Sequence, residues 1–111
     1  MTIDLSQLIT AEMKAAQAQA ATVEQFRSAI QAHVDAAAAT RLYDSGNSLA
    51  SYVASTNPAW AAEATAFVAW RDAVWAYAYT ELDRVMAGER EQPTVEEFIG
   101  ELPVIEWPPA A

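Results

Sequence analysis

Residues 57–88, NPAWAAEATAFVAWRDAVWAYAYTELDRVMAG, decide the fold of this chain. The polar side chain of Asn57 suits a helix cap, and Pro58 suits the first helical position because its missing N–H has no partner there in any helix. Gly88 stands where helices often close in a left-handed conformation. The stretch therefore predicts one helix over residues 58–87. One face of it carries Trp60, Ala64, Phe67, Arg71, Val74, Ala78, Leu82 and Val85.

A second long helix is predicted over residues 8–42, which contain neither glycine nor proline. Its apolar face consists of Val23, Phe26, Ile30, Val34 and Ala37. Residues 11–21 offer only Ala and Met as apolar groups, so this half either packs closely on another helix or projects as a thin arm. The run from Thr22 to Gln25 fits a capping box, and a break near residue 22 is an alternative to one continuous helix.

The remaining elements are short. Residues 44–48 have the composition of a turn, and Leu49 to Val53 suit one or two helical turns. Thr94 and Glu97 form a capping box, which predicts a short helix over residues 94–102. Residues 103–111 contain three prolines and are predicted to be an extended tail. Residues 1–111 are thus predicted to form a single all-α domain, with two long antiparallel helices, a short connecting helix and a short C-terminal helix.

Composition excludes several classes of function. The chain has 111 residues, no cysteine, one histidine and a net charge of −9. His33 lacks a partner at catalytic or ligand spacing, because Asp35 lies two residues away on another helical face. The three glycines are too far apart for a phosphate-binding loop. We predict a protein that is not an enzyme, with no metal and no cofactor. The surplus of acids argues against direct nucleic-acid binding, and no apolar run approaches the roughly 18 residues that indicate a membrane span.

The aromatic residues between positions 60 and 79 permit two interpretations. They either pack as a core or form a protein interface, in which Trp and Tyr are frequent hot spots. Arg71 lies among them and needs a partner, for which Glu63 and Asp72 are candidates. Two helices bury little apolar surface, so a homo-oligomer is an alternative to cover from the chain's own tail. The candidate partner-binding residues are Trp60, Phe67, Trp70, Arg71, Trp75, Tyr77 and Trp107.

Four segments carry a family resemblance. They are residues 8–16 (LITAEMKAA), 50–64 (ASYVASTNPAWAAEA), 67–79 (FVAWRDAVWAYAY) and 88–97 (GEREQPTVEE). Together they resemble a family of small proteins encoded in phage and prophage tail regions beside tail-fibre genes, which is grouped with tail-assembly chaperones. The resemblance implies a phage origin and a tail-associated role. It carries no active site that can be transferred to this chain.

Two functions are expected on these grounds. The resemblance implies a protein that binds a phage tail fibre or baseplate protein, as an assembly chaperone or a small structural tail subunit. Its location would be the cytoplasm of the infected bacterial host or the virion tail. The alternative is an acidic phage-encoded inhibitor of a host defence or nucleic-acid enzyme. This alternative is based on residues 81–106, whose eight acidic and two basic residues give a net charge of −6.

Overall fold

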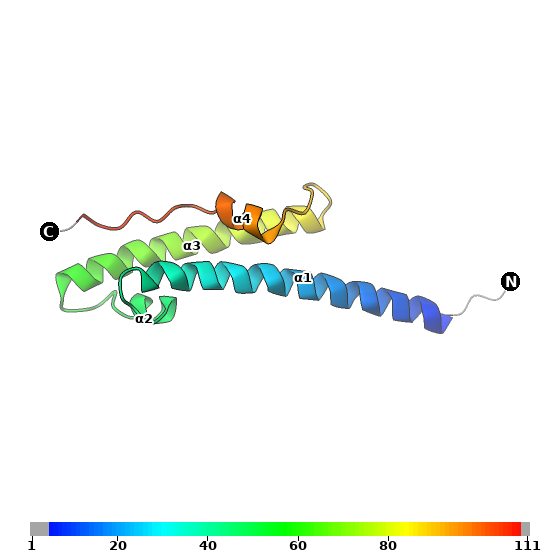
Figure 1. Ribbon diagram of the computed structural model, residues 1–111, viewed down its shortest axis with the longest axis horizontal. Helices are drawn as coiled ribbons and strands as arrows, with labels where there is room; N and C mark the ends of the chain where they lie inside the picture. Colours follow the sequence, from blue (N-terminus) through cyan, green and yellow to red (C-terminus); the bar gives the residue numbers. More distant parts are fainter. Residues whose placement is uncertain (1–4, 110–111) are drawn as a thin grey trace.

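The computed structural model describes residues 5–109, and the side chains of residues 10–109. Within this range it has four helices and no strand: α1 (Leu5–Ala39), α2 (Gly46–Ala50), α3 (Pro58–Met86) and α4 (Val95–Glu101) (Figure 1). The all-α prediction, with two long helices, a short connecting helix and a short C-terminal helix, is confirmed. Residues 102–109 continue as a chain without regular secondary structure, and the last residues of the predicted tail lie outside the described range.

The two long helices lie side by side and run in opposite directions (Figure 1). Arg41, just after α1, forms an ion pair with Glu63 near the start of α3 (3.8 Å). Further along, the ring centroids of His33 and Trp70 are 5.8 Å apart. The last turn of α3 lies beside residues 18–26 of α1. α3 therefore ends beside the middle of α1 and does not extend to the first residues of that helix.

The first half of α1 extends beyond the other helices. Every residue from 10 to 21 is exposed, and we call this segment the arm. The molecule measures 76 × 23 × 19 Å and has a radius of gyration of 19.4 Å, against about 13 Å for a compact domain of this length. Of the two arrangements that the sequence left open, the structure has the projecting arm.

α1 is continuous at Thr22, so the alternative of a break there is wrong. The Thr22 hydroxyl donates a hydrogen bond to the carbonyl of Ala18 in the preceding turn (3.0 Å) and caps nothing. Because the hydroxyl is satisfied within the helix, the capping pattern has no effect on the backbone. Residues 22–25 remain outside the interior, and burial in α1 begins at Phe26.

Both long helices end with the same hydrogen-bonding pattern. After α3 the left-handed residue is Gly88 (φ 75°), as predicted, and the next N–H donates to the carbonyl of Arg84 (2.9 Å). After α1 the left-handed residue is Leu42 (φ 70°), and the N–H of Tyr43 donates to the carbonyl of Ala38 (3.2 Å). This is the Schellman motif, which usually has glycine at the left-handed position. The motif ends α1 at Ala39, earlier than the predicted Leu42, without a glycine.

α2 is held by a cap and a close approach. The Ser45 side chain accepts a hydrogen bond from the N–H of Ser48 (3.1 Å), so the helix starts earlier than the sequence indicated. The N–H of Gly46 donates to the carboxylate of Asp35 on α1 (2.8 Å). A Cβ atom at Gly46 would lie 3.0 Å from that carboxylate and 3.1 Å from the Phe67 ring. Glycine therefore permits α2 to approach both long helices.

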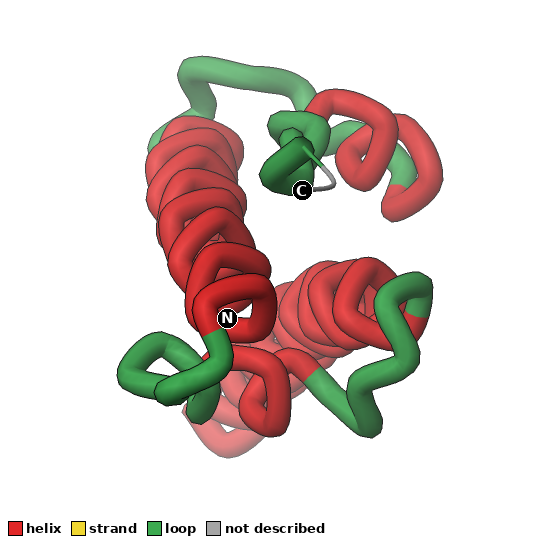
Figure 2. Tube along the Cα trace, turned by 90° about the vertical axis from the view of Figure 1, so that its left-hand side faces the viewer, coloured by secondary structure: helices red, strands yellow, loops and turns green. Residues whose placement is uncertain are grey.

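The core lies between α1, α3 and the chain that follows α3. Its buried apolar residues are Phe26, Ile30, Val34, Ala38, Leu49, Ala64, Phe67, Trp70, Val74, Ala78, Phe98 and Leu102. Seen along the long axis, α4 and the C-terminal chain lie on one side of the helix pair and α2 on the other (Figure 2). The predicted capping box of α4 is present, since Thr94 Oγ1 accepts from the N–H of Glu97 (3.1 Å). α4 inserts Phe98, whose ring meets that of Phe26 edge to face at 5.5 Å.

Candidate functional site

Two of the seven predicted binding residues lie in the interior. Phe67 is fully buried, and Trp70 is 7% exposed. The Trp70 indole N–H donates to the carbonyl of Pro103 (2.7 Å), so it ties the C-terminal chain to α3. These two side chains stabilise the fold, and they offer no surface to a partner while the C-terminal chain is in place.

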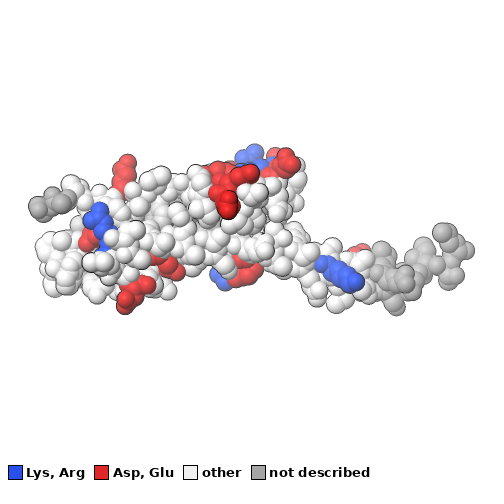
Figure 3. All heavy atoms as spheres, viewed as in Figure 1, with Lys and Arg blue, Asp and Glu red and all other residues white. Residues whose placement is uncertain are grey.

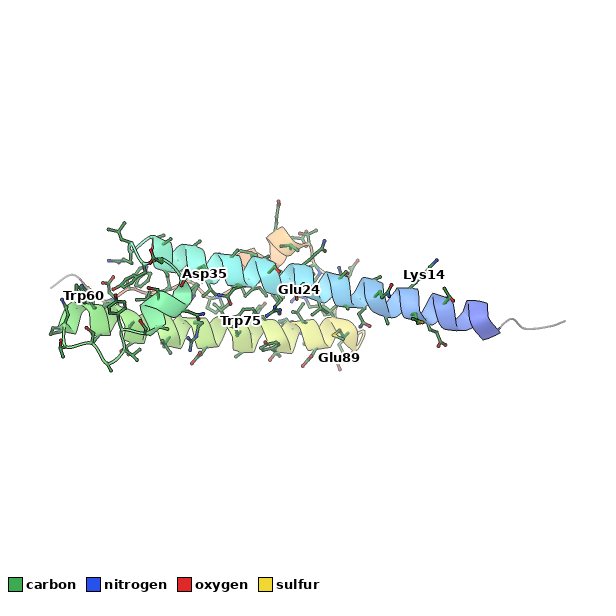
Figure 4. All side chains as sticks on the ribbon, turned by 90° about the horizontal axis from the view of Figure 1, so that it is seen from below. Lys14, Glu24, Asp35, Trp60, Trp75 and Glu89 are labelled. Atoms are coloured by element: carbon green, nitrogen blue, oxygen red, sulfur yellow. The ribbon has the colours of Figure 1, made fainter. Side chains whose placement is uncertain are left out.

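Three others lie on different faces of α3. Arg71 forms an ion pair with its neighbour Asp72 (3.0 Å), one of the partners that the sequence suggested. Trp75 faces the seam between α1 and α3 on the α2 side (Figure 4), and its ring lies 5.7 Å from that of Tyr79. Tyr77 points to the opposite side. These residues do not form one patch with the remaining two tryptophans.

Trp60 and Trp107 lie at the same end of the molecule, on either side of Arg41. The Arg41 guanidinium stacks over the Trp107 ring, 4.8 Å from its centroid, and forms the ion pair with Glu63. Arg41 and Glu63 also line a shallow groove together with Trp60. Trp107 is one of the candidate partner-binding residues. The structure packs it against the core and covers it with an arginine from the end of α1.

The sequence analysis missed the residues that surround Trp60. The Tyr52 ring meets the Trp60 ring edge to face at 5.8 Å, and the Tyr43 ring lies 5.5 Å from that of Tyr52. Leu42, which terminates α1, is 95% exposed beside them. We call this set, Leu42, Tyr43, Tyr52, Trp60 and Trp107, the aromatic end. Its signal in the sequence is a turn with a tyrosine on either side, which brings the two rings together.

Polar contacts fix the rings of the aromatic end in place. The Tyr43 hydroxyl donates to the carboxylate of Glu63 (3.4 Å). Burial, together with this carboxylate, raises the pKa of Tyr43 above its usual value. Tyr43 is therefore neutral near pH 7 and holds its hydroxyl toward Glu63. Among the described residues, no polar side-chain contact holds the Trp60 ring, which is 48% exposed and is therefore the aromatic ring at this end most available to a partner.

A second polar cluster fastens α4 to α3. The Tyr77 hydroxyl donates to one carboxylate oxygen of Glu101 (2.6 Å), and Arg90 donates to the other. Arg90 also forms an ion pair with Glu81 on α3 (3.0 Å). The hydrogen bond from Arg90, followed by that from Tyr77, lowers the pKa of Glu101, and the same carboxylate raises the pKa of Tyr77. The arrangement resembles a structural clasp rather than a reactive pair, because every charge in it has a partner.

Within residues 10–109, no group of three or more His, Asp or Glu side chains is placed to hold a metal ion. His33 packs its ring against Trp70 and has no carboxylate beside it among the described contacts. In the described part of the chain, no helix is long and apolar enough to cross a membrane.

Comparison with known proteins adds no relative. No family model matches the chain, and neither the curated proteins nor the solved structures contain a significant match.

Proposed function

We propose that this protein works by binding another protein through its aromatic end, without catalysis. The observation that supports this most is the Trp60 ring, which is half exposed although it meets the Tyr52 ring edge to face. Exposed Trp and Tyr side chains in preformed positions are typical hot spots, because they lose little conformational entropy on binding. Leu42, almost fully exposed beside them, adds apolar surface. Arg41 and Glu63 supply a charged rim.

The partner we propose is a phage tail fibre or baseplate protein, as the family resemblance implies. The protein would act as an assembly chaperone in the cytoplasm of the infected bacterium or as a small structural subunit of the virion tail. Homo-oligomer formation through the aromatic end belongs to the same proposal, since Leu42 and Trp60 leave apolar surface exposed there.

A pull-down of the tagged protein from phage-infected cells tests the tail role. Recovery of a tail fibre or baseplate protein supports it. Mass spectrometry of purified virions then separates the two versions, because a chaperone is absent from the finished particle and a structural subunit remains. Recovery of a basic host nuclease or defence enzyme would overturn the tail role in favour of the acidic inhibitor, whose binding should weaken steeply with added salt.

The same pull-down, repeated with variants, tests the surface. Trp60→Ala should weaken capture of the partner by at least about tenfold, the range of a binding hot spot. Val104→Ala is the matched control, because Val104 is 87% exposed and belongs to the C-terminal chain rather than the aromatic end. Circular dichroism verifies that both variants keep their helices. Equal capture by the parent protein and Trp60→Ala would exclude the aromatic end as the binding surface.

A further inference from the structure

A groove opens at the other end of the molecule, where the arm leaves the helix pair. It measures about 340 Å³, near the lower limit for ligand pockets in proteins of about 300 Å³. We call it the arm-root groove. Its floor and walls include Val23, Phe26, Leu82, Val85, Met86 and Gln92. A groove of this size accepts a short row of apolar side chains.

Large apolar side chains are left exposed along this groove. Met86 is 58% exposed and Val23 is 36% exposed, whereas Phe26 at the floor is 3% exposed. On the side toward α4, Phe98 covers Phe26. Among the described residues nothing covers Val23 and Met86 in the same way. The chain's own packing therefore stops part of the way along an apolar surface.

The surroundings of the groove are acidic. Asp83 adjoins Leu82, Glu91 adjoins Gln92, and Glu89 lies at the end of α3 (Figure 4). All three are exposed, and none forms an ion pair within residues 10–109.

The basic residues nearby do not neutralise these acids, because they are paired with other carboxylates: Arg27, next to Phe26, forms an ion pair with Glu24 (3.0 Å). Arg84 forms an ion pair with Glu81, and Arg90 bridges Glu81 and Glu101. Figure 3 accordingly shows acidic groups gathered over α4 and the end of α3. The electrostatic potential beside the groove is negative, and it attracts a basic partner.

We propose that the arm-root groove binds a basic amphipathic helix of a partner protein. Apolar side chains spaced three and four residues apart would enter the groove against Val23 and Met86, which is the usual way in which a helix occupies an apolar groove. Lysine or arginine side chains on the flanks of that helix would lie near Asp83, Glu89 and Glu91. This site is separate from the aromatic end, and it does not depend on the tail role.

A second copy of the chain fits the groove less well. The arm offers alanines and Met13, and the residues before it in α1, Leu5, Leu8 and Ile9, are apolar at spacings of three and four residues, so charge decides between the two occupants. Its charges, Glu12 and Lys14, cancel, so the arm gains little from the acids around the groove. Charge complementarity therefore selects a basic helix from another protein.

Binding of a synthetic helix to the full chain tests the proposal. The probe is a fluorescein-labelled amphipathic peptide of about 18 residues made of leucine and lysine. Its dissociation constant is measured by fluorescence anisotropy at low and high salt. We expect saturable binding that weakens with salt. A peptide with the same leucines and glutamate in place of lysine should bind at least about tenfold more weakly, because like charges repel.

Variants locate the binding. The double variant Val23→Ser, Met86→Ser should weaken binding of the leucine–lysine peptide at least about tenfold. The triple variant Asp83→Asn, Glu89→Gln, Glu91→Gln should weaken it to a similar extent and reduce its salt dependence. A matched triple variant neutralises three exposed acids elsewhere, Glu12→Gln, Asp44→Asn and Glu106→Gln, and should leave the affinity within about twofold. Thermal unfolding verifies that all variants are folded.

Three results would overturn the proposal. If both triple variants weakened peptide binding equally, the net charge of the protein, and not a specific site, would attract the peptide. Unchanged binding by the Val23, Met86 double variant would place the peptide elsewhere. Sedimentation equilibrium that shows a dimer of the parent protein, lost in the double variant, would assign the groove to a second copy of the chain. None of these results bears on capture of a tail protein by the aromatic end.

Discussion

The two halves of α1 belong to one unbroken helix but are stabilised in different ways. From Phe26 to Ala38, every third or fourth side chain is buried against α3, α2 or α4. From residue 10 to residue 21, every side chain is exposed, and alanine dominates. Alanine has the highest intrinsic helix propensity, and a helix that is already nucleated extends at low cost. The comparison shows that burial holds one half of the helix and local propensity holds the other.

The largest expected difference between the halves comes from truncating one side chain in each. Ile30→Ala removes a fully buried side chain and should lower the free energy of unfolding by about 2–5 kcal/mol. Met13→Ala, in the arm, should change it by no more than about 0.5 kcal/mol, since Met13 is 58% exposed. Urea denaturation followed by circular dichroism measures both. A large loss in Met13→Ala would show that the arm is packed in solution.

The next effect concerns the packed half and its contact with α2. Gly46→Ala places a methyl group 3.0 Å from the Asp35 carboxylate and 3.1 Å from the Phe67 ring. We expect a loss of about 1–3 kcal/mol in stability, because hydrogen bonds from Gly46 and Gln31 hold the Asp35 carboxylate and the Phe67 ring is fully buried. Gly100→Ala is the control, since a Cβ there meets nothing within 4 Å. A thermal unfolding scan of both variants decides the matter. Equal midpoints would mean that α2 does not approach α1 as closely as described.

A smaller effect should come from the residue that ends the packed half. Leu42 adopts a left-handed conformation (φ 70°) and is 95% exposed, so its side chain adds strain without burial. Leu42→Gly should raise the free energy of unfolding by about 1 kcal/mol. The reverse exchange, Gly88→Leu after α3, should lower it by about 1–2 kcal/mol, because φ is 75° and no neighbouring atom contributes. Opposite shifts of the two urea midpoints are expected, and shifts of the same sign contradict the shared motif.

The smallest effect concerns the clasp that holds α4 over the packed half. Hydrogen bonds from Arg90 and Tyr77 lower the pKa of Glu101 in the folded state. Its contribution to stability is therefore present above the unfolded pKa of about 4.3 and is lost as the pH falls through the lower folded value. Glu101→Gln should reduce stability at pH 7 by less than about 1 kcal/mol, because the pair is partly exposed.

The pH dependence distinguishes the clasp from a general effect of charge. The stability difference between Glu101→Gln and the parent protein should shrink when urea denaturation is repeated at an acidic pH, because the parent's Glu101 binds a proton as the pH falls. Glu106→Gln removes an exposed acid that has no ion pair in the described chain, and it should leave the urea midpoint nearly unchanged at both values of pH. A constant difference across the two conditions would contradict the clasp.

The sequence predicted the elements better than the exposure of the aromatic side chains. Asn57 with Pro58, Gly88, and Thr94 with Glu97 act as caps at the expected positions, because a cap depends on residues within one turn. The predicted end of the first helix at Leu42 was wrong. α1 ends at Ala39 because Leu42 adopts a strained left-handed conformation, while its neighbours Arg41 and Tyr43 make tertiary contacts with Glu63. The prediction also grouped Trp60 with Phe67 and Trp70, since spacing along a helix cannot tell which face another segment will cover.

The sequence by itself determined that this chain is helical, where α3 and α4 begin, and which residues of α1 form an apolar face. These properties arise from backbone preferences and from spacings of three and four residues, which are local. Only the tertiary structure decided that the arm stays uncovered, that Arg41 covers Trp107, and that Val23 and Met86 face solvent. Those outcomes depend on how far α3 and the C-terminal chain extend along α1, and such lengths matter only after the helices pack.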